Sequence, residues 1–185
     1  MNTTLSNIGI LLFSCLSWGL VEIILEFTKT TAKKAQHRKS FESWVFNIII
    51  VSALLMFFFT SKPFHFFSPN LASAIVLIGL LIRLTAIRQL GRFFSVDLGI
   101  HGDHKLIQKG WYRMVRHPTY TGAIISFIGL TLFFQDLRFN LIFIGIVLAS
   151  YLWRIKVEEG MLLAKFNTEY ADYKRSTKAL IPWVI

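Results

Sequence analysis

The chain has few cysteines and few acidic residues, and each shortage excludes a class of protein. Cys15 is the one cysteine among 185 residues, which leaves no disulfide framework and no cysteine-based metal site. Acidic residues number 10 against 20 lysines and arginines, for a formal charge of +10. No regular pattern of basic and aromatic residues accompanies this charge, so we expect no nucleic-acid partner. A positive balance is instead typical of the cytoplasmic loops of membrane proteins.

Several signatures of soluble enzymes and secreted proteins are also missing. We find no phosphate-binding glycine loop, no Ser-His-Asp pattern, no paired carboxylates arranged for hydrolysis and no internal repeat. His101 and His104 with Asp97 and Asp103 match no metal-site spacing, so we expect no metal. The first seven residues lack the basic region of a cleaved signal peptide, which makes the first apolar run a permanent membrane helix in our interpretation.

Long apolar runs dominate what is present. Hydrophobic residues make up 54% of the chain and the mean hydropathy is +0.55, which is more apolar material than a soluble domain of this length needs. A spanning helix requires about 20 mostly apolar residues. The sequence therefore predicts an all-α integral membrane protein, one domain over residues 1–185, with about five transmembrane helices at Ile8–Phe27, Trp44–Thr60, Leu71–Leu90, Tyr120–Phe134 and Asn140–Val157.

The distribution of basic residues predicts a topology. They gather after the first expected helix, after the third and in the tail. Five spans put these three segments on one side, which the positive-inside rule makes cytoplasmic, with the N-terminus outside and the C-terminus cytoplasmic. The compact length favours the plasma membrane of a prokaryote.

The ends of the last two expected helices are also constrained. The short connection 135–139 makes these helices an antiparallel hairpin. Residues 158–183 are expected to extend the fifth helix and then form a short amphipathic piece. Phe166, Tyr170 and Tyr173 recur there at helical spacing, and we expect them to pack against the membrane face.

Polar and aromatic residues cluster at the mouth of the fourth expected helix, in Gly110–Gly122. Pro118 suits the first position of a helix, because its missing N–H is not needed there, and this puts His117 at or beside the N-cap. The free N–H groups and the positive dipole end of such a terminus favour an anion, for example a carboxylate. The alternative is that Arg116 meets lipid phosphates and His117 only caps the helix.

A second constellation lies at the cytoplasmic end of the fifth expected helix. Arg154 and Glu158 are four residues apart and share a face with Tyr151. Alone, they would be read as an intrahelical salt bridge. The hairpin brings them beside the start of the fourth helix, so we expect the two constellations to meet. Arg83, inside the third span, is either a functional charge or a side chain that reaches the interface.

Taken together, these residues resemble the isoprenylcysteine carboxyl methyltransferase family. The resemblance covers Gly91–Pro182, so that residues 91–185 would form a methyltransferase core and residues 1–90 three N-terminal transmembrane helices. It rests on His104–Tyr112, on Arg116-His-Pro-Thr-Tyr-Thr-Gly122, on Arg154 with Glu158 and Glu159, on Phe166–Tyr173 and on the closing Leu180–Pro182.

The resemblance implies an integral-membrane methyltransferase that binds S-adenosylmethionine in a cytoplasmic pocket. Arg154 would face the methyl acceptor and share the catalytic role with Glu158. Asn167 replaces a glycine common in the family, and asparagine also tolerates turn conformations. The cofactor contacts carried over by position are His104, Lys105, Leu106, Ile107, Tyr112, His117, Pro118, Thr119, Tyr120 and Glu158.

The chemistry of these residues agrees with that implication. Tyr112, Tyr120 and Trp111 offer aromatic faces to a sulfonium, and the carboxylate of Glu158 suits a positive group. A carboxylate acceptor needs no general base, and Arg154 can hold it through paired hydrogen bonds. We therefore expect carboxyl O-methylation of an isoprenylcysteine-like or other lipophilic acid, small or carried by a prenylated partner, that arrives from the bilayer.

Other functions remain open from the sequence. A neutral amine acceptor would need a proton acceptor such as Glu159, which would fit a phospholipid N-methyltransferase. A reductase that uses a nicotinamide cofactor is disfavoured by the compact chain. A membrane-binding protein without catalysis is the alternative outside the enzymes.

Overall fold

Helices are the regular elements of the part of the chain described by this computed structural model, together with one isolated β-bridge. The described residues are 13–14, 16–17, 19–20, 68–93, 106–134 and 136–182. The expected span Trp44–Thr60 and most of Ile8–Phe27 lie outside them, so the count of five helices stays a prediction. In order, the elements are α3 (Pro69–Leu90), the 3-10 turn η2 (Gly91–Phe93), α4 (Trp111–Met114), α5 (Pro118–Thr131) and α6 (Leu137–Ser176).

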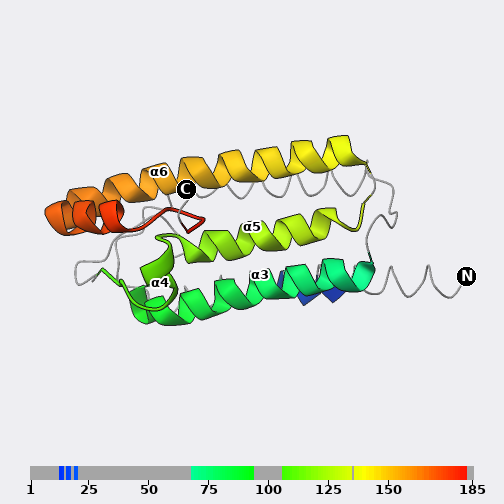
Figure 1. Cartoon of the computed structure of the whole chain (residues 1–185), viewed down its shortest axis with the longest axis horizontal. Coiled ribbons are helices and arrows are strands. Elements are labelled where there is room, and N and C mark those ends of the chain that lie inside the picture. The colour runs from blue at the N-terminus through cyan, green and yellow to red at the C-terminus, as the bar shows by residue number, and fades with distance from the viewer. Residues whose placement is uncertain are drawn as a thin grey trace, which may run out of the picture.

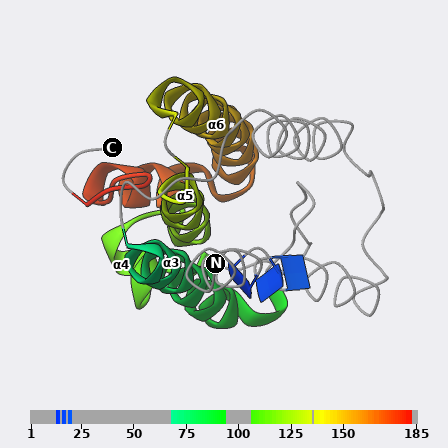
Figure 2. The same cartoon turned by 90° about the vertical axis from the view of Figure 1, so that its right-hand side faces the viewer.

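The three long helices run side by side, with α5 between α3 and α6 (Figures 1 and 2). The chain leaves α5 at Thr131 and returns along it in α6. Asp136 caps the start of α6, because its Oδ1 accepts hydrogen bonds from the backbone N–H groups of Arg138 at 3.1 Å and Phe139 at 3.4 Å. This cap begins the helix three residues before the expected start at Asn140.

Glycines bring α3 and α5 into backbone contact. A Cβ placed on Gly79 would lie 2.5 Å from the carbonyl oxygen of Gly122, and one placed on Gly122 would lie 2.5 Å from the carbonyl oxygen of Gly79. Nearby, the buried Ser126 hydroxyl donates to the carbonyl of Val76 at 3.0 Å. Small residues of this kind let membrane helices approach closely where lipid offers no hydrophobic gain for association. The pair therefore forms a fixed support for the first turn of α5.

A sharp bend at Asn167 divides α6. Asn167 has φ 46° and ψ −115°, and a positive φ is a conformation that few residues other than glycine and asparagine adopt. Beyond the bend the helix folds back on the molecule and ends at Ser176 (Figure 1). The expected helical extension is present, but residues 177–182 are not helical. The expected membrane packing of Tyr170 and Tyr173 is wrong, since the bend turns them inwards to exposures of 1% and 5%.

Residues 177–182, which we call the C-terminal segment, pair with the approach to α5. Lys178 forms a parallel β-bridge with Val115. The backbone N–H of Arg116 donates to the carbonyl of Lys178 at 2.8 Å, and that of His117 donates to the carbonyl of Ala179 at 2.9 Å. These bonds fix the backbone of Arg116 and His117 in one conformation just before the helix begins.

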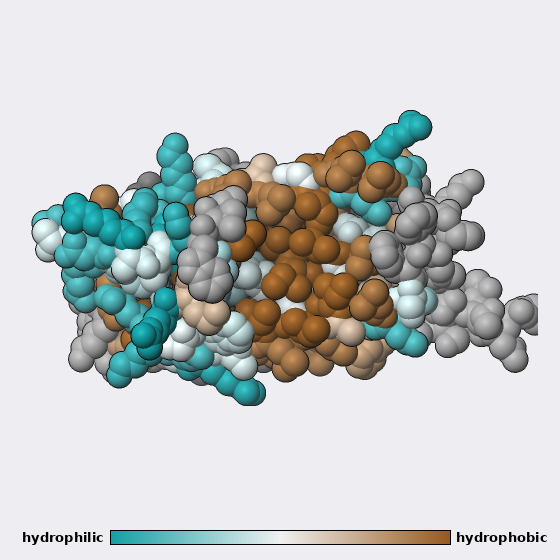
Figure 3. All heavy atoms as spheres, in the orientation of Figure 1, coloured by the Kyte–Doolittle hydropathy of each residue, from teal (hydrophilic) through white to brown (hydrophobic). Residues whose placement is uncertain are grey.

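Two long apolar helices and an apolar surface (Figure 3) fit a membrane protein. Of the described helices, α3 and α6 are long and apolar enough to cross a bilayer. The 14 residues of α5 extend roughly 21 Å at about 1.5 Å per residue, less than the hydrocarbon thickness of about 30 Å. Figure 3 shows an apolar belt over the middle of the molecule and polar side chains gathered at the end that holds α4 and the C-terminal segment in Figure 1.

Candidate functional site

The approach to α5 carries its polar residues into the interior of the protein. His117 is the N-cap residue of α5 and Pro118 follows in the first turn, as the sequence predicts. His117 is only 4% exposed, and its side chain makes no capping hydrogen bond. The imidazole is therefore available for contacts with α6 rather than for the helix terminus.

His117 lies close to both adjacent glutamates of α6, Glu158 and Glu159. Its Nδ1 is 3.6 Å from Oε2 of Glu158, and its Nε2 is 3.4 Å from Oε1 of Glu159. Burial by itself lowers the pKa of His117, but the two carboxylates outweigh burial and raise the pKa above its ordinary value. The imidazole thus takes up a proton readily between these two carboxylates.

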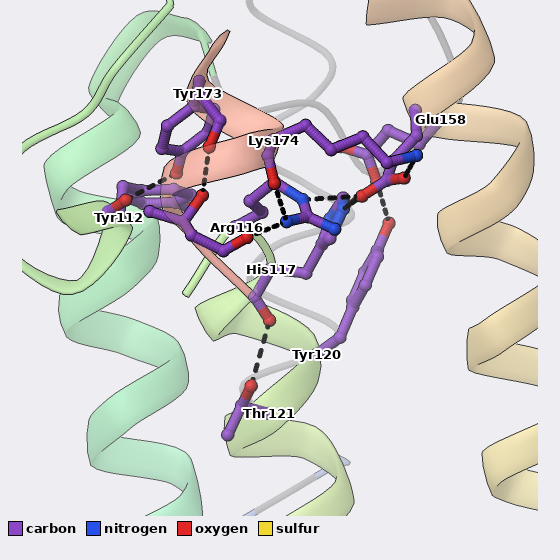
Figure 4. A network of polar contacts seen from close by, with 10 residues as sticks. Tyr112, Arg116, His117, Tyr120, Thr121, Glu158, Tyr173 and Lys174 are labelled. Atoms are coloured by element: carbon purple, nitrogen blue, oxygen red, sulfur yellow. Dashed lines mark hydrogen bonds and ion pairs between the residues drawn. The ribbon is translucent and has the colours of Figure 1, made fainter. Parts of the chain in front are cut away.

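Glu159 is held by two further cations. Arg116 Nε donates to Oε1 of Glu159 at 2.7 Å, and Lys174 Nζ lies 2.6 Å from Oε2. Arg116 also donates from Nη1 to the carbonyl of Lys174 at 3.2 Å and to the carbonyl of Thr177. Arg116 is therefore not a lipid-facing side chain. It ties Glu159 to the folded-back end of α6 and to the C-terminal segment (Figure 4).

Tyr120 links Glu158 to Arg154. Its hydroxyl donates to Oε2 of Glu158 at 2.8 Å and accepts from Nε of Arg154 at 3.0 Å. The ring of Tyr120 stacks on His117, with centroids 5.5 Å apart and planes at 4°, and it also meets Tyr151 at 5.2 Å. Arg154 is 5% exposed. The two constellations identified in the sequence therefore do meet, and they do so through Tyr120.

We call this set of residues the polar cluster. It gathers charged and polar side chains from three separate parts of the chain, so that each glutamate faces at least one basic group. Its members are Arg116, His117, Tyr120, Arg154, Glu158, Glu159 and Lys174.

Tyr112 stands beside the polar cluster with an unused hydroxyl. Its side chain is 7% exposed, and the hydroxyl makes no hydrogen bond with any residue that the structure describes. Its carbonyl accepts from the hydroxyl of Tyr173 at 2.5 Å, which holds α4 against the end of α6. Burial raises the pKa of Tyr112, and the charge of Glu158 raises it further. A buried neutral hydroxyl without a partner suits a polar atom of a ligand.

The indole of Trp111 fixes α4 to the end of α3. Its backbone N–H donates to Oε1 of Gln89 at 2.9 Å, and its Nε1 donates to Oγ1 of Thr85 at 2.9 Å. Gly110 precedes it with φ 60°, and a Cβ there would lie 2.5 Å from Oε1 of Gln89. Trp111, expected to offer a face to a cation, thus has a role in positioning α4.

The remaining predicted residues are spread along the approach to the polar cluster. Leu106 and Ile107 are half-buried on the irregular segment before α4, and Pro118 is buried. The carbonyl of Thr119 accepts from Nη1 of the buried Arg83 at 3.3 Å, so Arg83 faces protein rather than lipid. His104 and Lys105, like the neighbouring His101, Asp97 and Asp103, lie outside the described residues.

Sequence reasoning missed the residues that come from the end of α6 and the C-terminal segment. Lys174 and Tyr173 reach the site only because α6 bends at Asn167. The hydroxyl of Thr121 donates to the carbonyl of Leu180 at 2.8 Å. The sequence signal for this contact is the closing Leu180–Pro182 stretch, which is part of the family resemblance but indicates no role by itself.

Comparisons with known proteins agree on one family. The model of the isoprenylcysteine carboxyl methyltransferase (ICMT) family matches residues 72–164. The chain is 24% identical to protein-S-isoprenylcysteine O-methyltransferase A of Arabidopsis thaliana over 99% of this chain and 96% of that protein. It is 29% identical to the Arabidopsis B protein, over 69% and 66%, and 32% identical to the Tribolium castaneum protein-S-isoprenylcysteine O-methyltransferase, over 75% and 52%.

A solved structure gives the same result. The eukaryotic intramembrane Ras methyltransferase ICMT is similar to this chain with a TM-score of 0.55 and 28% identity, over 81% of this chain and 55% of that one. The matched part therefore spans about two thirds of the Arabidopsis B protein and about half of the Tribolium protein and of the solved chain. These relatives are eukaryotic, so they do not support the prokaryotic membrane expected from the compact length.

Proposed function

Because the chain belongs to the isoprenylcysteine carboxyl methyltransferase family, we propose that it methylates a carboxylate of a lipophilic thioether acid with S-adenosylmethionine. The observation that carries this proposal is the meeting of Arg154, Tyr120 and Glu158 beside the N-terminus of α5. This meeting supports the proposal, because a buried cation that would hold the acceptor lies next to groups that suit a charged cofactor.

The described residues fit S-adenosylmethionine, which carries a carboxylate, an ammonium and a sulfonium. Glu158 would hold a positive group and the terminus of α5 with His117 an anionic one. The unpartnered hydroxyl of Tyr112 would find its missing partner in the cofactor. The residues proposed to hold it are His104, Lys105, Leu106, Ile107, Tyr112, His117, Pro118, Thr119, Tyr120 and Glu158. When bound, the cofactor supplies an activated methyl group.

Arg154 is proposed to position the acceptor. Its Nε bond to Tyr120 at 3.0 Å orients the guanidinium, and a guanidinium binds a carboxylate with matching planar geometry. Burial at 5% exposure strengthens that attraction by excluding water. A carboxylate attacks as an anion, so positioning is the main task of the protein.

The same contacts make N-methylation a weaker alternative. An amine acceptor must lose a proton, and Glu159 was the candidate for receiving it. Glu159 is instead engaged by Arg116 at 2.7 Å and Lys174 at 2.6 Å. Two cations at this distance favour its ionised form and so make it a poor base.

We propose that the chain is a multi-pass protein of the plasma membrane with five spans. Its N-terminus would lie outside and its C-terminus in the cytoplasm. The α5–α6 pair would form the proposed hairpin, and the polar end in Figure 3 would face the cytoplasm, where the cofactor is available. The acceptor, a small lipophilic acid or a prenylated partner, would enter from the bilayer between helices.

Cofactor binding tests the proposal first. Purified protein in detergent should show a higher Tm with S-adenosylhomocysteine, because a ligand that binds only the folded state stabilises it. Labelled cofactor is then incubated with a prenylcysteine analogue or with phosphatidylethanolamine. Label on the prenylcysteine supports the proposal, whereas label on the phospholipid alone, or no Tm shift, overturns it.

A further inference from the structure

A basic groove lies next to the polar cluster but shares no lining residue with it. The groove has a volume of about 300 Å³ and opens between α4 and the C-terminal segment. Three cationic residues line it, Arg113, Arg175 and Lys178. None of them belongs to the residues proposed for the cofactor or the acceptor.

Among the described residues, no carboxylate lines the groove. The nearby Asp172 forms an exposed ion pair with Nη1 of Arg175 at 3.2 Å. The hydroxyls of Ser176 and Thr177 donate to the carbonyl of Tyr173 at 3.0 and 2.6 Å, so they add no negative charge. The groove is therefore a place where an anion gains two or three favourable contacts.

The groove also has apolar neighbours. Met114 lines it and is 49% exposed, Pro182 lines it, and Ile181 beside Pro182 is 50% exposed. A soluble anion gains nothing from contact with such apolar side chains. A phospholipid does gain from it, because its phosphate is joined to glycerol and acyl chains that lie against apolar residues. The elements that form the groove lie at the polar end, beyond the apolar belt (Figures 1 and 3).

We propose that the groove between α4 and the C-terminal segment binds the headgroup of an anionic phospholipid. Arg113 and Lys178 would hold the phosphate, with Arg175 at the rim and Met114 against the glycerol end.

Binding there would brace the polar cluster. The carbonyl of Lys178 accepts from the N–H of Arg116 at 2.8 Å, and the carbonyl of Thr177 accepts from its guanidinium. The groove wall is thus the same backbone that holds Arg116. A lipid that links α4 to the C-terminal segment would keep this backbone in place, and the protein would be more stable with it.

The test compares two lipids and two pairs of substitutions in the full chain. Tm is measured in detergent with added phosphatidylglycerol or phosphatidylcholine, and bound lipid is titrated by native mass spectrometry. The groove pair is Arg113→Gln with Lys178→Gln. The control pair is Arg88→Gln with Lys165→Gln, which removes the same charge from exposed positions outside the groove.

We expect phosphatidylglycerol to raise Tm more than phosphatidylcholine does, in the unchanged protein and in the control pair. In the groove pair the affinity for phosphatidylglycerol should fall roughly fivefold for each cation removed, and the extra rise in Tm should be lost. An equal loss in both pairs would show diffuse attraction and overturn the proposal. So would the absence of any difference between the lipids, or an equal rise in Tm with inorganic phosphate.

These outcomes are separate from those for the proposed function. The lipid measurements need no cofactor, and S-adenosylhomocysteine binding is followed in the absence of phosphatidylglycerol. If the protein fails to bind the cofactor but phosphatidylglycerol still raises its Tm through the groove, the lipid site is supported and the proposed function is not.

Discussion

The α3–α5 interface and the polar cluster lie within two turns of each other on α5, yet different forces hold them. At Gly122 the two helix backbones touch, and what matters is the absence of a side chain. At His117 and Tyr120 the contacts join charged and polar side chains at the start of α5 to the two glutamates of α6. The stability of the first region should depend on the size of a side chain, and the stability of the second on charge and protonation.

This difference has a functional consequence. A backbone-to-backbone contact permits little movement, so the N-terminus of α5 is presented at a fixed place. The polar cluster is built on that support from residues more than 30 positions apart in sequence, such as Tyr120 and Glu158. Catalytic groups work best when rigid elements hold them in this way.

The largest effect is expected at Arg154. Arg154→Ala should lower turnover roughly a hundredfold, because a poorly placed acceptor reacts far more slowly. Affinity for S-adenosylhomocysteine should change little, since the proposed role is toward the acceptor. Steady-state methyl transfer and calorimetric binding of S-adenosylhomocysteine measure the two separately.

The matched control for Arg154 is Lys156→Ala, which removes an exposed cation from the same helix. It should leave both quantities near those of the unchanged protein. Full turnover in Arg154→Ala would remove the acceptor role. An equal loss of cofactor affinity would instead make Arg154 a support for Tyr120 and Glu158.

The next effect is steric. Gly122→Ala places a methyl group 2.5 Å from the carbonyl oxygen of Gly79 and 2.7 Å from the backbone nitrogen of Arg83. The helices must move apart, at a cost of about 1–3 kcal/mol for such overpacking. Gly145→Ala is the matched control, because nothing lies within 4 Å of a Cβ there. Thermal unfolding should show a lower Tm only for Gly122→Ala, and its deficit should not vary with pH.

The pH dependence of stability tests the electrostatic role of His117 in the polar cluster. Its raised pKa means that the protonated imidazole stabilises the folded state. That contribution is complete below the ordinary pKa of about 6.5 and is lost as pH rises through the higher pKa of the folded protein. The difference in Tm between the unchanged protein and His117→Gln should therefore shrink from acidic to alkaline pH. A difference that stays constant or grows would mean that the imidazole is not protonated between the two glutamates.

Much of this arrangement was predictable from local patterns in the sequence. The Arg-His-Pro run predicted His117 at the N-cap, and the apolar runs predicted both ends of α3 and the start of α6 to within three residues. The short connection before α6 brought Arg154 and Glu158 to the start of α5. Each of these inferences depends on contacts close in sequence or on helical spacing alone.

The missed features depend on one residue with an uncommon backbone. Asn167 at φ 46° turns the end of α6 back, and this single bend buries Tyr170 and Tyr173 and brings Lys174 to Glu159. Helical periodicity carries no information on such a bend, because the spacing of Tyr170 and Tyr173 is helical on either side of it. The pairing of Arg116 with Lys178 is likewise a long-range backbone contact that no motif specifies.

The smallest effect on stability is expected at Tyr112. Its buried hydroxyl makes no hydrogen bond, so Tyr112→Phe should change the free energy of unfolding by no more than about 0.5 kcal/mol. Tyr173→Phe removes a hydroxyl that does donate, to the carbonyl of Tyr112 at 2.5 Å, and should cost about 1 kcal/mol.

The contrast between these two tyrosines reverses when the cofactor is present. If the hydroxyl of Tyr112 binds the cofactor, Tyr112→Phe should weaken S-adenosylhomocysteine binding by up to about tenfold, the value of one hydrogen bond, with Tm of the free protein unchanged. Isothermal titration and thermal unfolding on the same samples give both numbers. A lower Tm without any loss of affinity would mean that the hydroxyl serves the fold, and Tyr112 would then belong with the α3–α5 support rather than with the site.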